Sequence, residues 1–121
     1  ELRRAIHDFY TKELAEIDGL SVQQNPSTDF NSNFWLSTVL IDPKTGKDPE
    51  SLRQFMLDAG VETRRLWRPM HMQPVFADAP YYGGTTCETL FDRGLCLPSG
   101  SGLKEEELRY VADKIKEFFN K

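Results

Sequence analysis

Apolar residues recur at helical spacing at both ends of the chain. In the first 17 residues they fall mostly three or four positions apart, at Leu2, Ile6, Phe9, Tyr10, Leu14 and Ile17. A second set predicts a helix from about Glu105 to Phe119, with the buried stripe Leu108, Val111, Ala112, Ile115 and Phe118. No Ser, Thr, Asp or Asn stands in front of the first helix as a cap, so we expect this helix to continue a longer polypeptide.

Four apolar runs between these helices are typical of strands. Residues 20–25 and 61–67 predict short strands, the second ended by Pro69, which cannot donate to a sheet ladder. Residues 34–41 carry apolar side chains at both odd and even positions, which predicts a central strand covered on both faces. Residues 95–98 predict a short buried strand.

A third helix has clear boundaries in the sequence. Asp48 is placed to cap it, Pro49 takes the first helical position, and Gly60 supplies a left-handed stop. From Arg68 to Thr86 the chain is rich in proline and glycine, so it predicts an irregular segment that serves a function or an interface. Residues 85–94 then predict a short helix that ends at Gly94.

The order of these elements indicates the fold class. Helices and strands follow one another as α-β-β-α-β-α-β-α, without the strict alternation of a parallel sheet. We therefore predict an α+β fold in which a small, mostly antiparallel sheet packs with helices.

Composition and charge exclude some classes of function. The chain has 121 residues, 39% hydrophobic and 28% charged, which fits one ordinary globular domain. The formal net charge of −4 argues against a nucleic-acid partner, and no apolar run is long enough for a membrane span. Two cysteines make no disulfide framework, so a reduced, cytoplasmic setting is expected.

Soft metal ligands are few and dispersed. His7, His71, Cys87 and Cys96 do not fall at the spacing of two to four residues that is typical of zinc sites, and we predict no metal site. No local pattern supports a nucleophilic pair of cysteine and histidine. Both cysteines are expected to be inert, buried core residues.

The stretch ETRRLWRPMHMQPVF, residues 62–76, gathers the candidate binding chemistry. Three arginines beside Trp67 suit a phosphate, a carboxylate or a stacked ring. Alternation along a strand predicts that Arg65 and Trp67 share one face, with Arg64 on the other. His71 can donate or accept a hydrogen bond near neutral pH. Judged alone, these residues fit a solvated surface equally well.

Several segments together resemble a known family. VETRRLWRPMHMQPVF (61–76), LFDRGLCLPSGSGLKEEELRYVADKIKEFF (90–119), RRAIHDFYTKEL (3–14) and NSNFWLSTVLID (31–42) resemble the C-terminal part of the DegT/DnrJ/EryC1/StrS aminotransferases. These enzymes depend on pyridoxal 5'-phosphate (PLP) and transfer amino groups onto nucleotide-linked keto-sugars of cell-surface or secondary-metabolite biosynthesis. The resemblance covers nearly the whole chain.

The resemblance implies a fold-type I aminotransferase whose N-terminal large domain, which carries PLP, is not in this chain. Residues 1–17 would be the interdomain helix and residues 18–121 the small C-terminal α/β domain that completes the substrate cleft. The lysine that bonds PLP belongs to the large domain, so we expect no catalytic or cofactor-binding residue here and no activity of the 121 residues alone. The full-length enzyme is expected to be a cytoplasmic homodimer that uses a nucleotide-sugar substrate and an amino donor, expected to be glutamate.

The family's motifs also suggest which residues contact the substrate. Arg64, Trp67, Pro69, Met70 and His71 match the family's Arg-Pro-x-Trp-x-Pro-Met-His stretch, and Asn33 and Trp35 match its Asn-Arg-Trp segment. The predicted substrate-binding residues are thus His71, Arg64, Trp67, Asn33 and Arg65. At two positions the chain departs from the pattern, with Phe34 in place of a frequent arginine and Arg65 in place of a frequent proline.

Two other interpretations stay open at this point. The chain could be a free-standing α+β binding or regulatory module that holds a small anion, or an interaction domain without a ligand. If the chain lacks a neighbouring large domain, we expect an exposed apolar patch along the first helix and near Trp67 that promotes self-association.

Overall fold

The computed structural model describes all 121 residues, Glu1 to Lys121, as a four-stranded antiparallel sheet with four α-helices. The strands, in the sheet order β1-β2-β4-β3, are β1 (Leu20–Val22), β2 (Ser37–Ile41), β4 (Gly94–Leu97) and β3 (Arg64–Arg65). The helices are α1 (Leu2–Glu13), α2 (Pro49–Asp58), α3 (Thr86–Arg93) and α4 (Glu105–Asn120). This arrangement confirms the predicted α+β class and the predicted order of elements.

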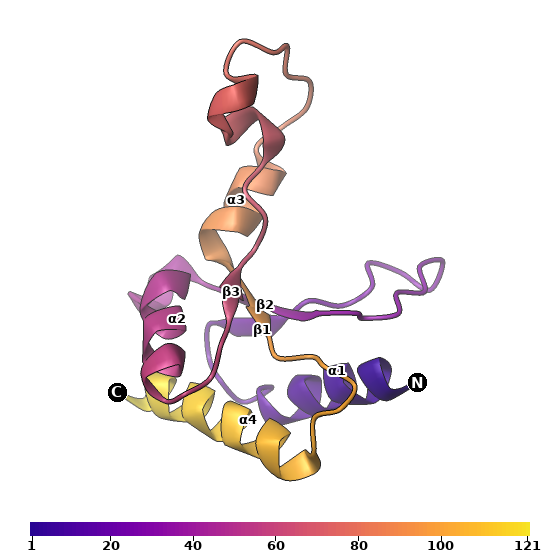
Figure 1. The fold of residues 1–121 in the computed structure, drawn as a ribbon, viewed down its shortest axis with the longest axis vertical. Coiled ribbons are helices and arrows are strands. Elements are labelled where there is room, and N and C mark those ends of the chain that lie inside the picture. Colours follow the sequence, from indigo (N-terminus) through magenta and orange to yellow (C-terminus); the bar gives the residue numbers. More distant parts are fainter.

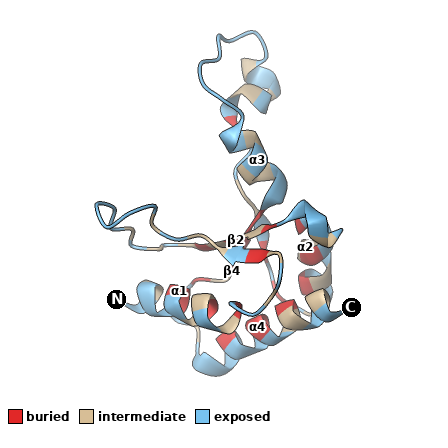
Figure 2. Cartoon of the chain, turned by 180° about the vertical axis from the view of Figure 1, so that it is seen from behind, coloured by how far each residue is buried: buried red, intermediate tan, exposed pale blue.

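The core lies between one face of the sheet and the helices α1, α2 and α4 (Figures 1 and 2). Val39 and Leu95, paired across β2 and β4, are fully buried on this face. Tyr10 of α1 is also fully buried, and its hydroxyl donates to the Pro98 carbonyl oxygen at 2.8 Å. Burial raises the pKa of Tyr10, so its hydroxyl stays protonated and keeps donating.

The signals that bound α2 are confirmed. The Asp48 carboxylate accepts hydrogen bonds from the backbone N–H groups of Glu50 and Ser51, and Pro49 opens the helix. Gly60 follows the helix with a φ of 78°, in the left-handed region where glycine has no steric penalty. Leu52 and Met56 of this helix are fully buried in the core.

Several predicted boundaries are wrong, including the end of β1, which is Val22 and not residue 25. α1 ends at Glu13, because residues 14–19 fold into turns that reverse the chain into β1. β2 begins at Ser37, because side chains in the preceding loop bond to its own backbone and hold it away from the extended conformation. The second face of β2 is less covered than predicted, since buried residues alternate with the half-buried Thr38 and Leu40. β3 comprises two residues, with little of 61–67 paired to the sheet.

An arm formed by residues 68–93 projects from the sheet (Figure 1). It contains two short 3-10 turns, Met70–Met72 and Pro74–Phe76, a loop, and α3. Apart from these turns, residues 68–85 are irregular, as predicted. α3 ends at Gly94 as predicted, but this glycine has an extended conformation and starts β4 directly.

Candidate functional site

Strand register determines which residues face away from the helices. Thr38 of β2 lies opposite Cys96 of β4, which lies opposite Arg64 of β3. Directly opposed residues of antiparallel strands point to the same face. Val39 and Leu95 occupy the helix-covered face, so this row of three belongs to the opposite, open face of the sheet.

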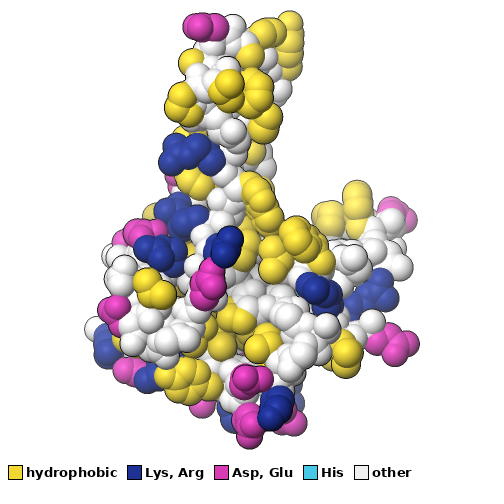
Figure 3. All heavy atoms as spheres, viewed as in Figure 1, with side chains coloured by type: hydrophobic (Ala, Val, Ile, Leu, Met, Phe, Trp, Pro, Cys, Tyr) yellow, Lys and Arg dark blue, Asp and Glu magenta, His cyan; other side chains and the backbone are white.

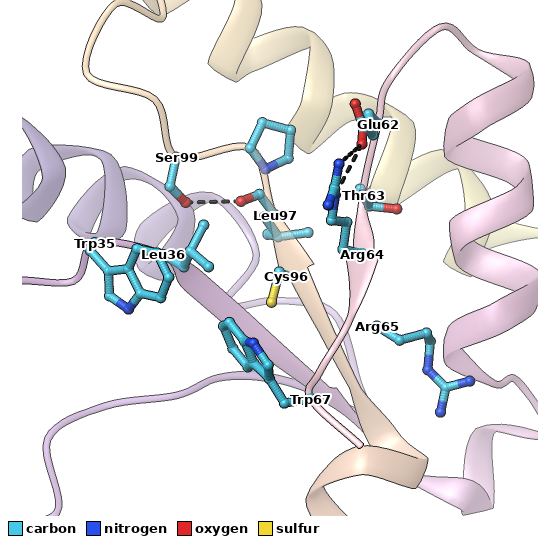
Figure 4. A pocket seen from close by; sticks show the side chains of 11 residues that line it. Trp35, Leu36, Glu62, Thr63, Arg64, Arg65, Trp67, Cys96, Leu97 and Ser99 are labelled. Atoms are coloured by element: carbon cyan, nitrogen blue, oxygen red, sulfur yellow. Dashed lines mark hydrogen bonds and ion pairs between the residues drawn. The ribbon is translucent and has the colours of Figure 1, made fainter. Parts of the chain in front are cut away.

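A cavity of about 460 Å³ opens where β3 and the end of β4 meet the loop before β2 (Figure 4). Its lining includes two tryptophans, two arginines, Glu62, Cys96 and Ser99. The Ser99 hydroxyl accepts from the Ser37 backbone N–H at 2.8 Å and donates to the Leu97 carbonyl oxygen at 2.9 Å. These buried hydrogen bonds fix the cavity rim to both central strands.

Trp35 and Trp67 form an aromatic pair at the cavity. Their ring centroids are 5.9 Å apart and their planes are inclined by 30°, in a stacked arrangement. The two residues remain 57% and 63% exposed, respectively, so each offers indole surface to a ligand. A pair of this kind suits a sugar or nucleobase ring.

Arg64 supplies a positive charge beside the aromatic pair. Its guanidinium donates to a single carboxylate oxygen of Glu62, from Nη2 at 2.7 Å and from Nε at 3.0 Å. The Arg64 side chain is 80% exposed, so the ion pair lies in solvent and can exchange for an anionic ligand at small cost.

Arg65 points away from the cavity, contrary to the prediction that it shares a face with Trp67. It is paired with Leu95, so its side chain leaves the sheet on the helix side, and Figure 4 shows the guanidinium turned away from the other lining side chains. Its Nη2 donates to the Phe91 carbonyl oxygen at 2.6 Å, and its guanidinium carbon lies 5.0 Å from the centroid of the Phe91 ring. Strand alternation ends at Arg65, so it does not extend to Trp67.

His71 lies in the arm and is not part of the cavity lining. Its Nε2 is 2.7 Å from a carboxylate oxygen of Glu88 in α3, and its ring stacks on Tyr81 with centroids 3.9 Å apart. The Tyr81 hydroxyl donates to the Gly84 carbonyl oxygen and lies 3.7 Å from the Cys87 sulfur. The hydrogen bond to Cys87 raises the pKa of Tyr81. Together these contacts connect the 3-10 turn that contains His71 to the loop at Tyr81 and to α3, all within the arm.

Asn33 is exposed in the loop before β2 and does not line the cavity. Its side-chain oxygen accepts from the Trp35 backbone N–H at 3.1 Å. The structure therefore brings together Arg64 and Trp67, adds Trp35, and leaves His71 and Asn33 outside.

The two cysteines differ in their surroundings. Cys96 is buried at the cavity, and burial raises the pKa of its thiol, which keeps it protonated and unreactive as predicted. Cys87 is exposed on the arm, so the prediction that it fills a core is wrong. No three side chains of His, Cys, Asp or Glu lie close enough together to hold a metal ion.

Most of the lining was not among the predicted binding residues, including the polar or titratable side chains of Glu62, Thr63, Cys96 and Ser99. Cys96 belongs to the cavity because β4 pairs with β3, a contact between distant segments that no local pattern reveals. Glu62 had a usable signal, because it lies near the start of a predicted strand, two residues before Arg64 and with the opposite charge.

The cavity contains no lysine, so its lining offers no amine that could bond a PLP aldehyde. The arginine and the indoles can instead bind an anion and a ring.

None of the helices combines the length and the apolar character that a membrane span requires.

Comparison with known proteins places these features in a family context. The model of the DegT/DnrJ/EryC1/StrS aminotransferase family matches residues 1–116. "Putative pyridoxal phosphate-dependent aminotransferase EpsN" of Bacillus subtilis is 36% identical over 124 residues, covering 99% of this chain and 31% of that protein. The GDP-perosamine synthase of Escherichia coli O157:H7 is 30% identical over 118 residues, covering 98% and 31%.

Solved structures agree with this match. The crystal structure of DesI in the presence of its TDP-sugar product superposes with a TM-score of 0.86 at 26% identity, over 98% of this chain and 31% of that one. The chain thus spans about a third of the length of the relatives it matches.

Proposed function

The chain belongs to the DegT/DnrJ/EryC1/StrS aminotransferase family, and from this premise we propose that it is the C-terminal small domain of a PLP-dependent enzyme that aminates a nucleotide-linked keto-sugar. The observation that carries the proposal is the cavity of Arg64, Trp35 and Trp67 within a chain that the family model matches along residues 1–116.

The chemistry of the cavity supports a nucleotide-sugar ligand. A guanidinium pairs with phosphate oxygens in a planar fork, and indoles stack on rings. The Arg64 guanidinium and the two indoles lie at the same opening. Two relatives support the same ligand class by their descriptions, since one is a GDP-perosamine synthase and the structure of another, DesI, was determined in the presence of its TDP-sugar product.

In this proposal the chain binds and orients the substrate and does not hold the cofactor. PLP supplies the amino-group exchange when it is bound in the remainder of the polypeptide. The cavity of this chain lacks the amine that such a cofactor needs, so no chemical step is assigned to its residues. Of the predicted substrate-binding residues, Arg64 and Trp67 have the most direct access, whereas His71 and Asn33 need a ligand or neighbouring domain that extends to the arm and the loop.

The proposal includes the organisation of the complete enzyme. Residues 1–17 would lead from the large domain, and residues 18–121 would form the small domain. The enzyme would work as a cytoplasmic homodimer with glutamate as amino donor.

The experiment is an assay of the full-length protein that contains this chain. It is incubated with PLP, glutamate and a panel of nucleotide-linked keto-sugars, and amino-sugar products are detected by mass spectrometry. We expect product from at least one keto-sugar. No turnover on any keto-sugar or related carbonyl compound, with PLP bound, would refute the proposal.

The 121-residue chain alone provides the second arm of this experiment. It should give no turnover and no stoichiometric covalent adduct with PLP, because the amine is expected elsewhere. The alternative of a free-standing module predicts something different: an anion bound by the 121 residues and no lysine-bearing neighbour in the encoded polypeptide.

A further inference from the structure

Phe34 has a backbone conformation that is rare outside glycine. Its φ is 46°, and the other residues with positive φ are all glycines. A side chain in this left-handed region persists only where its surroundings hold it, and such residues collect at functional sites. Phe34 immediately precedes Trp35, one of the two indoles of the cavity.

The Phe34 ring is held by a flat stack on His7 of α1. The ring centroids are 3.6 Å apart and the planes differ by 12°. His7 is itself fixed, because it is 2% exposed and its Nε2 lies 2.9 Å from the Gln23 carbonyl oxygen, to which it donates. The stack thus rests on a buried ring that cannot easily turn.

Two arginines of α1 hold the backbone on both sides of Phe34. Arg3 donates from its guanidinium to the Trp35 carbonyl oxygen. Arg4 donates from Nε to the Ser32 carbonyl oxygen at 3.1 Å. The helix therefore secures the residues before and after the left-handed position.

We propose that Phe34, stacked on His7, is a positioning residue that sets the Trp35 indole against Trp67 at the cavity. Phe34 does not line the cavity, so it acts through Trp35 and not by touching a ligand. The effect on ligand binding rests on the proposed function, in which a nucleotide sugar contacts the indole pair. The placement of Trp35 does not rest on it.

The physical reason is the coupling between the stack and the backbone. Without the aromatic ring, the arginine hydrogen bonds to Ser32 and Trp35 alone do not fix residue 34, and the peptide between residues 34 and 35 rotates: alanine relaxes toward an ordinary conformation, and glycine gains a wider range of conformations. Because side chains follow their backbone, this rotation moves Trp35 away from Trp67.

The first readout is circular dichroism of the indole pair in the full-length protein. Trp35 and Trp67 are the only tryptophans of this chain, and two indoles this close couple electronically and give a paired far-ultraviolet band. Subtracting the spectrum of Trp67→Phe isolates that band. We expect Phe34→Ala to remove most of it and Phe34→Tyr to keep it, because tyrosine preserves the stack.

Two further variants separate positioning from general damage. Phe34→Gly removes the ring but tolerates the left-handed conformation, so it should fold normally and still lose the band. Phe30→Ala is the matched control, since Phe30 lies in the same loop, is 58% exposed and stacks on no ring. It should leave the band unchanged.

The second readout is binding of GDP-mannose and dTDP-glucose, measured by calorimetry. Phe34→Ala should weaken binding roughly tenfold, which corresponds to about 1.4 kcal/mol, whereas Phe34→Tyr and Phe30→Ala should bind like the parent. A band that persists in both Phe34→Ala and Phe34→Gly overturns the proposal. Loss of the band with unchanged binding overturns the role of Phe34 at the ligand site.

The two proposals fail in different ways. If the parent protein binds neither probe and aminates no keto-sugar, but Phe34→Ala still abolishes the band, the proposed function is refuted and the positioning of Trp35 by Phe34 is upheld.

Discussion

Arg64 and His71 come from one short stretch of sequence but lie in different surroundings. Arg64 stands at the cavity with an exposed side chain, whereas His71 is held in the arm between Glu88 and Tyr81. A sequence motif indicates that residues belong together in function, but only the path of the chain decides which of them share a cavity. Here the break after β3 separates the two.

Arg64 yields a prediction that isolates binding from stability. Arg64→Ala should raise KM for the nucleotide sugar roughly tenfold in the full-length enzyme, because a charge-assisted contact to phosphate is lost. The melting temperature should change little, since the ion pair with Glu62 is exposed. Arg53→Ala is the control, because Arg53 also pairs with a nearby carboxylate, that of Glu50 at 2.6 Å on α2, but does not line the cavity. Equal KM values for the two variants would contradict the assignment of Arg64.

At the scale of the elements, α2 depends on its N-terminal cap. The hydrogen bond from the Ser51 hydroxyl at 2.6 Å, followed by backbone N–H donors, lowers the pKa of Asp48. Asp48→Ala should lower the free energy of unfolding by about 1 kcal/mol, measured by urea denaturation at pH 7. Asp113→Ala is the control, because Asp113 is exposed on α4 with no hydrogen bond or ion pair from its side chain.

The pH dependence of this cap has a definite sign. A lowered folded-state pKa means that the carboxylate stabilises the fold above its unfolded value of about 3.9, and that this stability is lost as the pH falls through the folded value. The difference between the parent and Asp48→Ala should therefore be constant near neutral pH and shrink below pH 4. A difference that grew on acidification would contradict the prediction.

The junction of α3 and β4 requires glycine for a reason of space. A Cβ on Gly94 would overlap the Leu66 side chain and approach the Leu90 carbonyl oxygen to 2.6 Å. Gly94→Ala should destabilise the fold by about 1–3 kcal/mol in chemical denaturation. Gly100→Ala, where a Cβ meets nothing within 4 Å, should have no comparable effect. Equal stability of both variants would show that the helix can shift to make room.

Local signals predicted those elements that are bounded by local chemistry. The cap at Asp48, the stop at Gly60 and the apolar stripe of α4 each lie within a few residues, so the sequence reveals them. The start of β2 and the length of β3 were wrong because they depend on loop hydrogen bonds and on pairing with β4, whose partners lie far along the chain. The cavity was foreseen only as a stretch of residues, since Cys96 and Ser99 reach it by the same distant pairing.

At the scale of the whole molecule, helices cover one face of the sheet and the arm projects away from them (Figure 1). The cavity opens on the face that these helices leave free. A large domain seated on the open side would account for this asymmetry, and we expect it there in the full-length protein. The outer part of the arm, residues 69–87, fits such a role, since it contains one acidic residue, Asp78, and no lysine or arginine.

The exposed apolar side chains predict how the 121-residue chain behaves alone. Figure 3 shows such side chains gathered on the arm and beside the cavity, and those at least 57% exposed include Trp35, Trp67, Met70, Val75 and Tyr82. In α1, only Leu2 is a large apolar residue with an exposed side chain, so the predicted patch along the first helix is wrong. The exposed apolar side chains lie on the arm and near Trp67 instead. Surfaces of this kind are typical of interaction sites and promote association when uncovered.

We therefore expect the isolated chain to self-associate in the micromolar range, as measured by sedimentation velocity over a concentration series. Replacing Val75 and Tyr82 by serine should lower the association constant roughly tenfold, because both side chains protrude from the arm and contribute apolar area. Leu57→Ser on α2, where Leu57 is 48% exposed on another surface, should leave association unchanged. A chain that stays monomeric at millimolar concentration would show that the arm needs no cover, and would weaken the case for a domain seated against it.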